Sequence, residues 1–147
     1  MSTSKAVVLD ASVVAKWHLD AEEFGEDARA LQRAFVDGEL TVVLPDHARC
    51  EVANAISVAC RRGRMTAESA TRAIRNLLAW DFSFVNTDEV LEEAFALARL
   101  HDCGLYDSLY LAIAERYQLD LVTADRALFR KTEGKVAGIR WLETYTL

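Results

Sequence analysis

The sequence predicts an α/β protein, a three-layer α/β/α sandwich built on a mostly parallel central sheet. Short apolar, β-branched segments alternate along the chain with longer segments in which apolar residues recur at helical spacing. Few tight-turn signals of the kind that join antiparallel strands interrupt this alternation. Parallel strands need long crossover connections, which are usually helices, so the alternation favours a sheet with helices on both faces.

Five segments have the features of strands. The first, residues 6–9, is a continuous apolar run that stops at Asp10, as expected of a strand buried on both faces of a parallel sheet. The last, residues 139–141, is predicted to lie at the edge of the sheet. The other predicted strands are residues 41–44, 82–85 and 119–123.

The segments between the strands are predicted to be helices with recognisable caps. Asp46 is expected to cap a helix that begins there and ends near Gly63, and Thr66 is expected to cap the next helix. Gly38 follows the helix predicted for residues 22–37, at a position where a left-handed residue is common. The remaining predicted helices are residues 11–17, 88–100 and 107–117, with a short helical turn at 125–130.

Length and composition predict one compact domain spanning residues 1–147. The chain is 52% hydrophobic and 27% charged, with one proline and six glycines, which is typical of a globular protein with a packed core. Its net charge of −6 lacks the basic footprint of an electrostatic nucleic-acid binder. A nucleic-acid substrate would therefore have to be held by local patches or by metal ions.

The three cysteines and the N-terminus predict a soluble, cytoplasmic protein. Cys50, Cys60 and Cys103 form no Cys-x-x-Cys pair, so we interpret them as reduced packing residues. A nucleophilic cysteine is the alternative, but no motif ties a histidine to any of them. The apolar run at residues 6–9 is too short for a signal peptide or a membrane span.

Two acidic residues follow predicted strands, at the edge of a parallel sheet where ligands usually bind. Asp10 follows the first predicted strand and Asp125 follows the strand that ends at Thr123, so both belong at the carboxyl edge of the sheet, where such folds bind ligands. Glu51 and Asp107 lie near the starts of helices in apolar surroundings. Carboxylates in apolar surroundings need a partner, and hard oxygen ligands without histidine or cysteine favour Mg²⁺ or Mn²⁺. A site of this type suits hydrolysis of a phosphodiester bond.

Each acid also has a purely structural interpretation. An aspartate after a strand is a common helix cap, so Asp10 could cap the helix that begins at Ala11, and Asp125 could cap its own short helix. Taken singly, neither residue separates the two interpretations. The case for a metal site therefore depends on the acids acting as a set.

Four motifs make the sequence resemble the PIN domains, and most closely the VapC toxins of toxin–antitoxin pairs. Each motif alone is weakly specific, but together they cover nearly the whole chain in the family's order. They are Val-Leu-Asp-Ala-Ser at residues 8–12, Cys-Glu-Val-Ala-Asn-Ala at 50–55, Tyr-Asp-Ser-Leu-Tyr-Leu-Ala-Ile-Ala at 106–114 and Leu-Val-Thr-Ala-Asp at 121–125.

The resemblance implies a metal-dependent endoribonuclease with Mg²⁺ or Mn²⁺ as cofactor. It also implies a homodimer and control by a small VapB-like antitoxin. The metal-binding quartet that it implies is Asp10, Glu51, Asp107 and Asp125. The positions that match supporting hydrogen-bond donors are Ser12, Asn54 and Thr123.

Other chemistry-bearing residues are predicted to be structural. Trp17, Phe24 and Phe35 are expected in the core or, as the alternative, on a groove for an amphipathic helix of the partner. The histidines are expected at the surface or at helix ends, and the arginines mostly on solvated faces rather than on RNA phosphates. The histidines are His18, His47 and His101, and the arginines are Arg49, Arg61, Arg62, Arg64, Arg126 and Arg130.

Three rival functions are considered beside the nuclease. An aspartyl-nucleophile phosphatase fits Asp10 at a strand end, but the second aspartate that such enzymes use two residues later is absent. A phospho-acceptor receiver module would need an acidic pair after the first strand and a lysine after the last, and neither is present. A catalytically inactive PIN-like binding module would differ from a nuclease in binding Mn²⁺ weakly or not at all.

Overall fold

One parallel sheet organises the chain. In the computed structural model, which describes residues 3–20 and 22–147, five strands form this sheet in the order β3-β2-β1-β4-β5, and every neighbouring pair is parallel. The predicted α/β class is confirmed, as is the edge position of the last strand. The strands are β1 (Lys5–Leu9), β2 (Leu40–Pro45), β3 (Ser83–Val85), β4 (Leu121–Thr123) and β5 (Ile139–Trp141).

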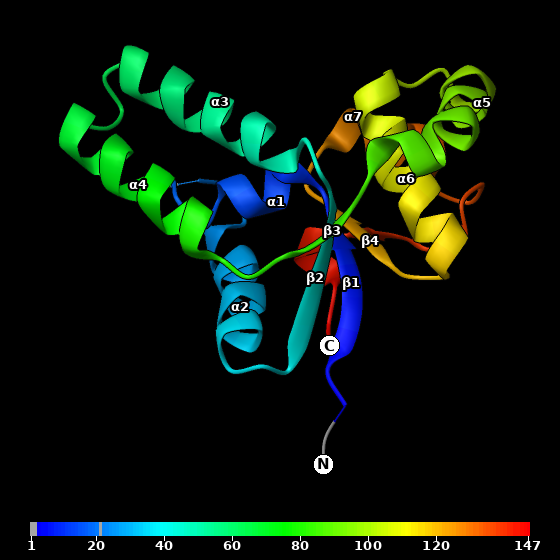
Figure 1. Ribbon diagram of the computed structural model, residues 1–147, viewed down its shortest axis with the longest axis horizontal. Helices are drawn as coiled ribbons and strands as arrows, with labels where there is room; N and C mark the ends of the chain where they lie inside the picture. Colours follow the sequence, from blue (N-terminus) through cyan, green and yellow to red (C-terminus); the bar gives the residue numbers. More distant parts are fainter. Residues whose placement is uncertain (1–2, 21) are drawn as a thin grey trace.

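Helices cover both faces of the sheet, which gives the three predicted layers (Figure 1). One side carries α1 (Ala11–Ala15), α2 (Gly25–Val36), α3 (Ala48–Arg61) and α4 (Ala67–Ala79). The other side carries α5 (Leu91–His101) and α6 (Leu105–Tyr117), while α7 (Arg126–Thr132) links β4 to β5. Short 3₁₀ turns are η1 (Thr87–Val90) and η2 (Leu142–Thr144).

The core forms around β1 because this strand is central and covered on both faces. Val7, Val8 and Leu9 are fully buried, as the uninterrupted apolar run predicted. On α6, the stretch 108–114 is buried throughout, since this helix packs against β1, β2 and β4. The carboxyl ends of β1 and β4 are thereby held in a rigid setting.

Some predicted helix boundaries are wrong, and one predicted cap is absent. Asp46 does not cap α3, which begins at Ala48 after His47. The Asp46 amide instead donates to the Val85 carbonyl and prolongs the pairing of β2 with β3. α2 begins at Gly25, later than predicted, because Phe24 has a left-handed backbone with φ of 58°. The Thr66 cap is confirmed, since its side chain accepts from the Ser69 amide.

Trp17, Phe24 and Phe35 pack against the core, as the sequence predicted. Trp17 stacks on Phe35 with ring centroids 5.7 Å apart, within an aromatic cluster that also contains Trp80 and Phe82. The ring of Phe24 lies elsewhere and packs against Trp141. The three side chains therefore belong to two separate aromatic contacts, and the groove for a partner helix stays a prediction.

Arg49 has a structural role that the sequence did not reveal. Its guanidinium donates to the carbonyls of Leu77 and Trp80 at the end of α4, at 3.3 and 2.7 Å. It also lies over the ring of Phe84, with 4.7 Å between guanidinium carbon and ring centroid. The last carbonyls of a helix lack internal partners, so one side chain on α3 caps α4.

We expect Arg49→Ala to lower the free energy of unfolding by about 1–3 kcal/mol, because carbonyls at the end of α4 lose charged donors. Arg49→Lys should recover less than half of this loss, since an ammonium lacks the planar fork that reaches two carbonyls. Urea denaturation monitored by circular dichroism measures both. Arg75→Ala on the exposed surface of α4 is the control, and equal stability of all variants would contradict the capping role.

No helix within the described residues combines the length and hydrophobicity needed to cross a membrane.

Candidate active site

The chain reverses direction across the sheet between β1 and β4, and the acids gather at that point. From β1 the chain moves outward through β2 to β3, then returns to place β4 on the other side of β1. In parallel sheets such a switch point opens a crevice at the carboxyl ends of the strands. Asp10 directly follows β1 and Asp125 follows β4 by two residues. The fold therefore brings together two acids that lie 115 positions apart in the sequence.

Asp10 is buried, and two hydroxyl groups hold its carboxylate. Ser12 Oγ donates to Asp10 Oδ2 at 2.8 Å, and Thr123 Oγ1 donates to the same oxygen at 2.9 Å. Asp10 occupies the N-cap position of α1, yet its side chain makes no capping hydrogen bond. The cap interpretation of Asp10 is therefore wrong, and the carboxylate has a different purpose.

The same two hydroxyls join the ends of β1 and β4. Ser12 Oγ accepts from the Ala124 amide at 3.1 Å, and Thr123 Oγ1 accepts from the Asp125 amide at 3.0 Å. Each hydroxyl thus donates to Asp10 and accepts from the loop that carries Asp125. The orientation of one acid is coupled to the backbone position of another.

Burial makes Asp10 hard to ionise. The pKa of Asp10 is raised from 3.8 to about 7, and burial is the largest cause. The charges of Asp107 and Glu51 add to the rise, whereas the hydrogen bonds from Ser12 and Thr123 oppose it. A carboxylate that is costly to charge in isolation is one that a nearby cation would favour.

Glu51 lies on the first turn of α3 between two aromatic residues. Tyr110 of α6 donates its hydroxyl to Glu51 Oε1 at 2.9 Å. His47 Nε2 approaches the same oxygen to 2.6 Å, although the angles are not those of a hydrogen bond. Burial, followed by the charges of Glu51 and Asp10, raises the pKa of Tyr110 far above its usual value, so the phenol stays protonated and donates.

Sequence reasoning missed both of these neighbours of Glu51. His47 precedes Glu51 by four residues, a spacing that brings side chains together along a helix. Tyr110 follows Asp107 by three residues on the inner face of α6. This helical spacing could have predicted that its side chain lies on the same face as Asp107. His47 is the N-cap of α3, so its predicted helix-end placement is confirmed, but its contact with Glu51 was not predicted.

Asp107 and Asp125 complete the acidic edge. Asp107 is half-buried on the first turn of α6; burial raises its pKa, the charges of Asp125 and Glu51 add to the rise, and Lys131 opposes it. Asp125 does cap its helix, since its Oδ1 accepts from the Leu128 amide at 3.1 Å. The cap occupies one carboxylate oxygen, so capping and metal binding are compatible at this residue.

The four acids influence one another electrostatically but do not form a finished coordination shell. Within the described parts of the chain, no three His, Cys, Asp or Glu side chains are arranged as a ready metal site. The donor chemistry nevertheless fits Mg²⁺ or Mn²⁺, because all four groups are carboxylates and one of them is buried with a raised pKa. Both contacts of Glu51, with His47 and Tyr110, are made through Oε1.

Two further predictions about side chains need correction. Asn54 was expected to support the acids by hydrogen bonding, but its side chain is exposed and bonds to none of the four carboxylates within the described residues. Cys50 was expected to pack internally and is exposed, although all three cysteines are free thiols, as predicted.

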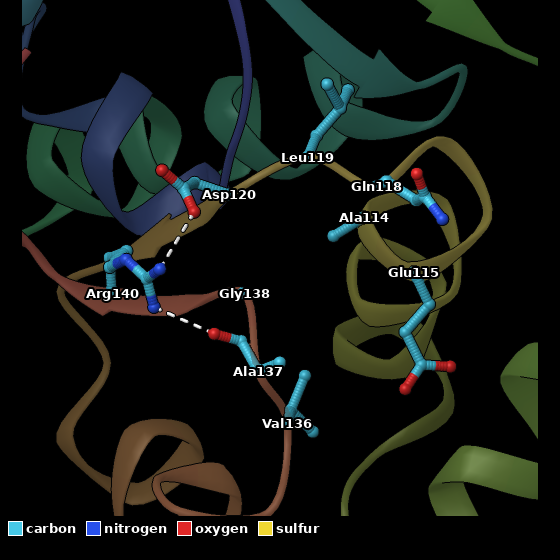
Figure 2. Close-up of a pocket in the computed structure, with 9 residues that line it drawn as sticks. All are labelled: Ala114, Glu115, Gln118, Leu119, Asp120, Val136, Ala137, Gly138 and Arg140. Atoms are coloured by element: carbon cyan, nitrogen blue, oxygen red, sulfur yellow. Dashed lines mark hydrogen bonds and ion pairs between the residues drawn. The ribbon is translucent and has the colours of Figure 1, made fainter.

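A pocket at the opposite end of the sheet is lined by none of the four acids. It has a volume of about 540 Å³ and is lined by the segments that precede β4 and β5 (Figure 2). Two of its charged groups pair with each other: Arg140 lies 3.2 Å from Asp120 and also donates to the Ala137 carbonyl at 2.8 Å. Parallel sheets place their chemistry at the other edge, so we assign this pocket a structural role.

Comparison with known proteins identifies the family. The PIN-domain family model matches residues 7–135, from β1 to the segment after α7. The chain belongs to the PIN-domain family. A relative from Pyrobaculum aerophilum, named ribonuclease VapC3, is 35% identical over 129 residues, which are 85% of this chain and 93% of the relative.

Solved structures share the fold of this PIN domain. The crystal structure of PAE2754 from Pyrobaculum aerophilum matches with a TM-score of 0.69 and 24% identity, covering 97% of this chain and 92% of that chain. A toxin–antitoxin complex from Klebsiella pneumoniae matches with a TM-score of 0.59 and 15% identity, covering 96% and 99% of the two chains. At these identities the two likenesses support the architecture alone.

The buried acid of this PIN domain predicts a pH-dependent stability when metal is removed. Because the pKa of Asp10 is about 7 when folded and near 3.8 when unfolded, the folded chain binds more protons between these values. The free energy of unfolding of the wild type, minus that of Asp10→Asn, should therefore fall as pH rises from about 4 to 7 and then level off. The fall should be about 4 kcal/mol at most.

Urea titrations of both chains in chelator at several pH values measure this difference. Taking the difference is necessary because burial lowers the pKa of His18 to about 4, which makes stability rise with pH in the acid range in both chains. A difference that stays constant across this range would show that the pKa of Asp10 is not raised in the folded protein.

Proposed function

We propose that this chain is a divalent-metal-dependent endoribonuclease, the toxin of a VapBC-type pair that acts in the cytoplasm. The observation that carries the proposal is the buried Asp10 at the switch point, held by Ser12 and Thr123 and raised in pKa beside the charges of Glu51 and Asp107. The relative named ribonuclease VapC3 supports the class of reaction.

Asp10, Glu51, Asp107 and Asp125 would hold Mg²⁺ or Mn²⁺. When bound, such a cation supplies a water of lowered pKa and neutralises negative charge on the phosphodiester and its leaving oxygen. Every oxygen donor of the set is a carboxylate, which suits these hard cations better than zinc.

The surrounding residues orient the acids. Ser12 and Thr123 direct their protons at Asp10 Oδ2, which leaves Oδ1 for the cation. Tyr110, kept protonated by its buried setting, holds Glu51 in place. Removing hydrogen-bond donors of this kind from a metal site usually costs ten- to a hundredfold in metal affinity or activity.

Two protein partners are proposed, an antitoxin and a second copy of this chain. The toxin–antitoxin complex from Klebsiella pneumoniae supports the first, since it shares the fold. An arginine or lysine inserted from the antitoxin would pair with the acids and compete with the cation. Leu91, Phe95 and Leu105 leave apolar side chains exposed along α5 and α6, which supports a homodimer.

We expect purified protein to cleave RNA only with Mg²⁺ or Mn²⁺, and EDTA to stop the reaction. Asp10→Asn should lower the rate about a hundredfold or more, because it removes a metal ligand and little volume. Cleavage of a labelled RNA, with matched circular-dichroism spectra, measures the effect.

Asp81→Asn, at an exposed acid with no ion pair within the described residues, is the charge-matched control and should remain fully active. A metal-dependent rate in Asp10→Asn equal to that of the wild type would remove Asp10 from the mechanism. Weak or absent Mn²⁺ binding by the wild type would instead favour the inactive binding module.

We expect expression of the chain alone to arrest bacterial growth, and co-expression with the small protein encoded beside it to restore growth. Asp125→Asn should abolish the arrest because a metal ligand is lost, although the amide oxygen can still cap α7. Growth curves at matched protein levels measure this. Harmless accumulation of soluble, metal-replete wild-type protein would contradict the toxin assignment while leaving the nuclease assignment open to the cleavage assay.

A further inference from the structure

A shallow basic and aromatic pocket lies beside the acidic edge. It has a volume of about 230 Å³ and its lining residues come from α7 and the end of β5: Arg126, Phe129, Arg130, Glu133 and Trp141. Nothing in the metal chemistry described above uses it.

The sheet register places this pocket next to the acids. Trp141 is the partner of Thr123 in the pairing of β4 with β5, and Thr123 donates to Asp10. Paired residues on neighbouring strands are about 5 Å apart. On the helix, Arg130 follows Asp125 by five residues, a rise of about 7 Å. A chain bound at the metal site would therefore reach the pocket without spanning the protein.

Aromatic contacts fix the walls of the pocket. The Trp141 ring packs against Phe129 and Phe24, with centroids 5.4 and 5.6 Å apart. The guanidinium of Arg126 lies over both Trp141 and Phe24, at 5.4 and 5.6 Å from their centroids, and pairs with Glu23 at 2.7 Å. Trp141 is nevertheless only half-buried, so part of its indole remains accessible.

The charge of the pocket differs from that of the molecule. Arg126 is compensated by Glu23, whereas Arg130 is exposed and has no ion pair within the described residues. The acid among the lining residues is Glu133. In a chain with a net charge of −6, the exposed guanidinium of Arg130 beside an accessible tryptophan is a local positive charge of the kind that an RNA substrate would need.

We propose that this pocket binds one nucleotide of the RNA substrate, with a base packed against the accessible part of Trp141 and a phosphate held by Arg130. The inference rests on the proposed ribonuclease function and deepens it. Aromatic faces and guanidinium groups are the usual platforms for unpaired bases, and arginine is a usual donor to phosphate. The volume is below the range of about 300–1,000 Å³ usual for whole small ligands, which favours a single base.

Tryptophan fluorescence and RNA affinity test the subsite together. The probe is a short, single-stranded, 2′-O-methyl RNA, added to the full chain with Ca²⁺ in place of Mn²⁺, because Ca²⁺ binds carboxylates but activates water poorly and the strand stays intact during the titration. We expect binding to quench the fluorescence and Trp141→Phe to abolish most of the quenching while affinity stays within about threefold, because phenylalanine still stacks. The two other tryptophans, Trp17 and Trp80, lie in the separate aromatic cluster and should not respond.

Arg130→Ala should weaken binding of the same RNA about fivefold to twentyfold, and in cleavage of unmodified RNA it should raise KM with little change in kcat. Arg75→Ala is the matched control: it removes one exposed arginine from α4, which lies on the opposite side of the molecule from α7 (Figure 1). It should leave affinity and KM unchanged.

Several outcomes would overturn the subsite. Quenching that persists in Trp141→Phe, or an RNA affinity of Arg130→Ala within twofold of the wild type, would do so. Loss of antitoxin binding in Arg130→Ala without loss of RNA binding would make the pocket a protein contact instead. A wild type that binds RNA with quenching dependent on Trp141 but never cleaves it would overturn the nuclease and leave the subsite standing.

Discussion

The buried carboxylate of Asp10 is the constraint around which the functional end of this protein is built. A carboxylate without water is costly, and here two hydroxyls, from Ser12 and Thr123, offset part of that cost by donating to a single oxygen. The same hydroxyls accept the amides of Ala124 and Asp125, so stabilising one acid also positions the loop that carries another. The raised pKa of Asp10 shows that this compensation is incomplete without a cation.

The side chains of the remaining acids accept fewer hydrogen bonds than this anchor. Glu51 is reached by the phenol of Tyr110 and approached by His47, whereas Asp107 stands half-buried at the start of α6. Asp125 has one oxygen in a helix cap and the other available. Repulsion among these carboxylates contributes to the raised pKa of Asp10 and Asp107, and a bound divalent ion of the kind proposed would relieve it.

Net charge is a poor guide to the partner of such a protein. Clustered acids contribute to the overall charge of −6, and bound cations would reverse their local effect. The arginines show how differently one residue type is used: Arg49 caps α4, Arg126 stacks on aromatic rings and pairs with Glu23, and Arg130 is left exposed beside Trp141. Local geometry decides which positive charge is available to a phosphate.

The sequence by itself determined the alternation of strands and helices, and therefore the parallel sheet and the edge at which Asp10 and Asp125 stand. Those features follow from hydrophobic periodicity and from the chain order of the strands, which are local properties. Whether Asp10 was a cap or a buried acid, and whether Asn54 assisted it, was decided by the tertiary structure, because both depend on which distant groups come within hydrogen-bond distance. Tyr110 beside Glu51 and Trp141 beside Thr123 are contacts of the same kind, created when α6 and β5 pack against elements remote in the chain.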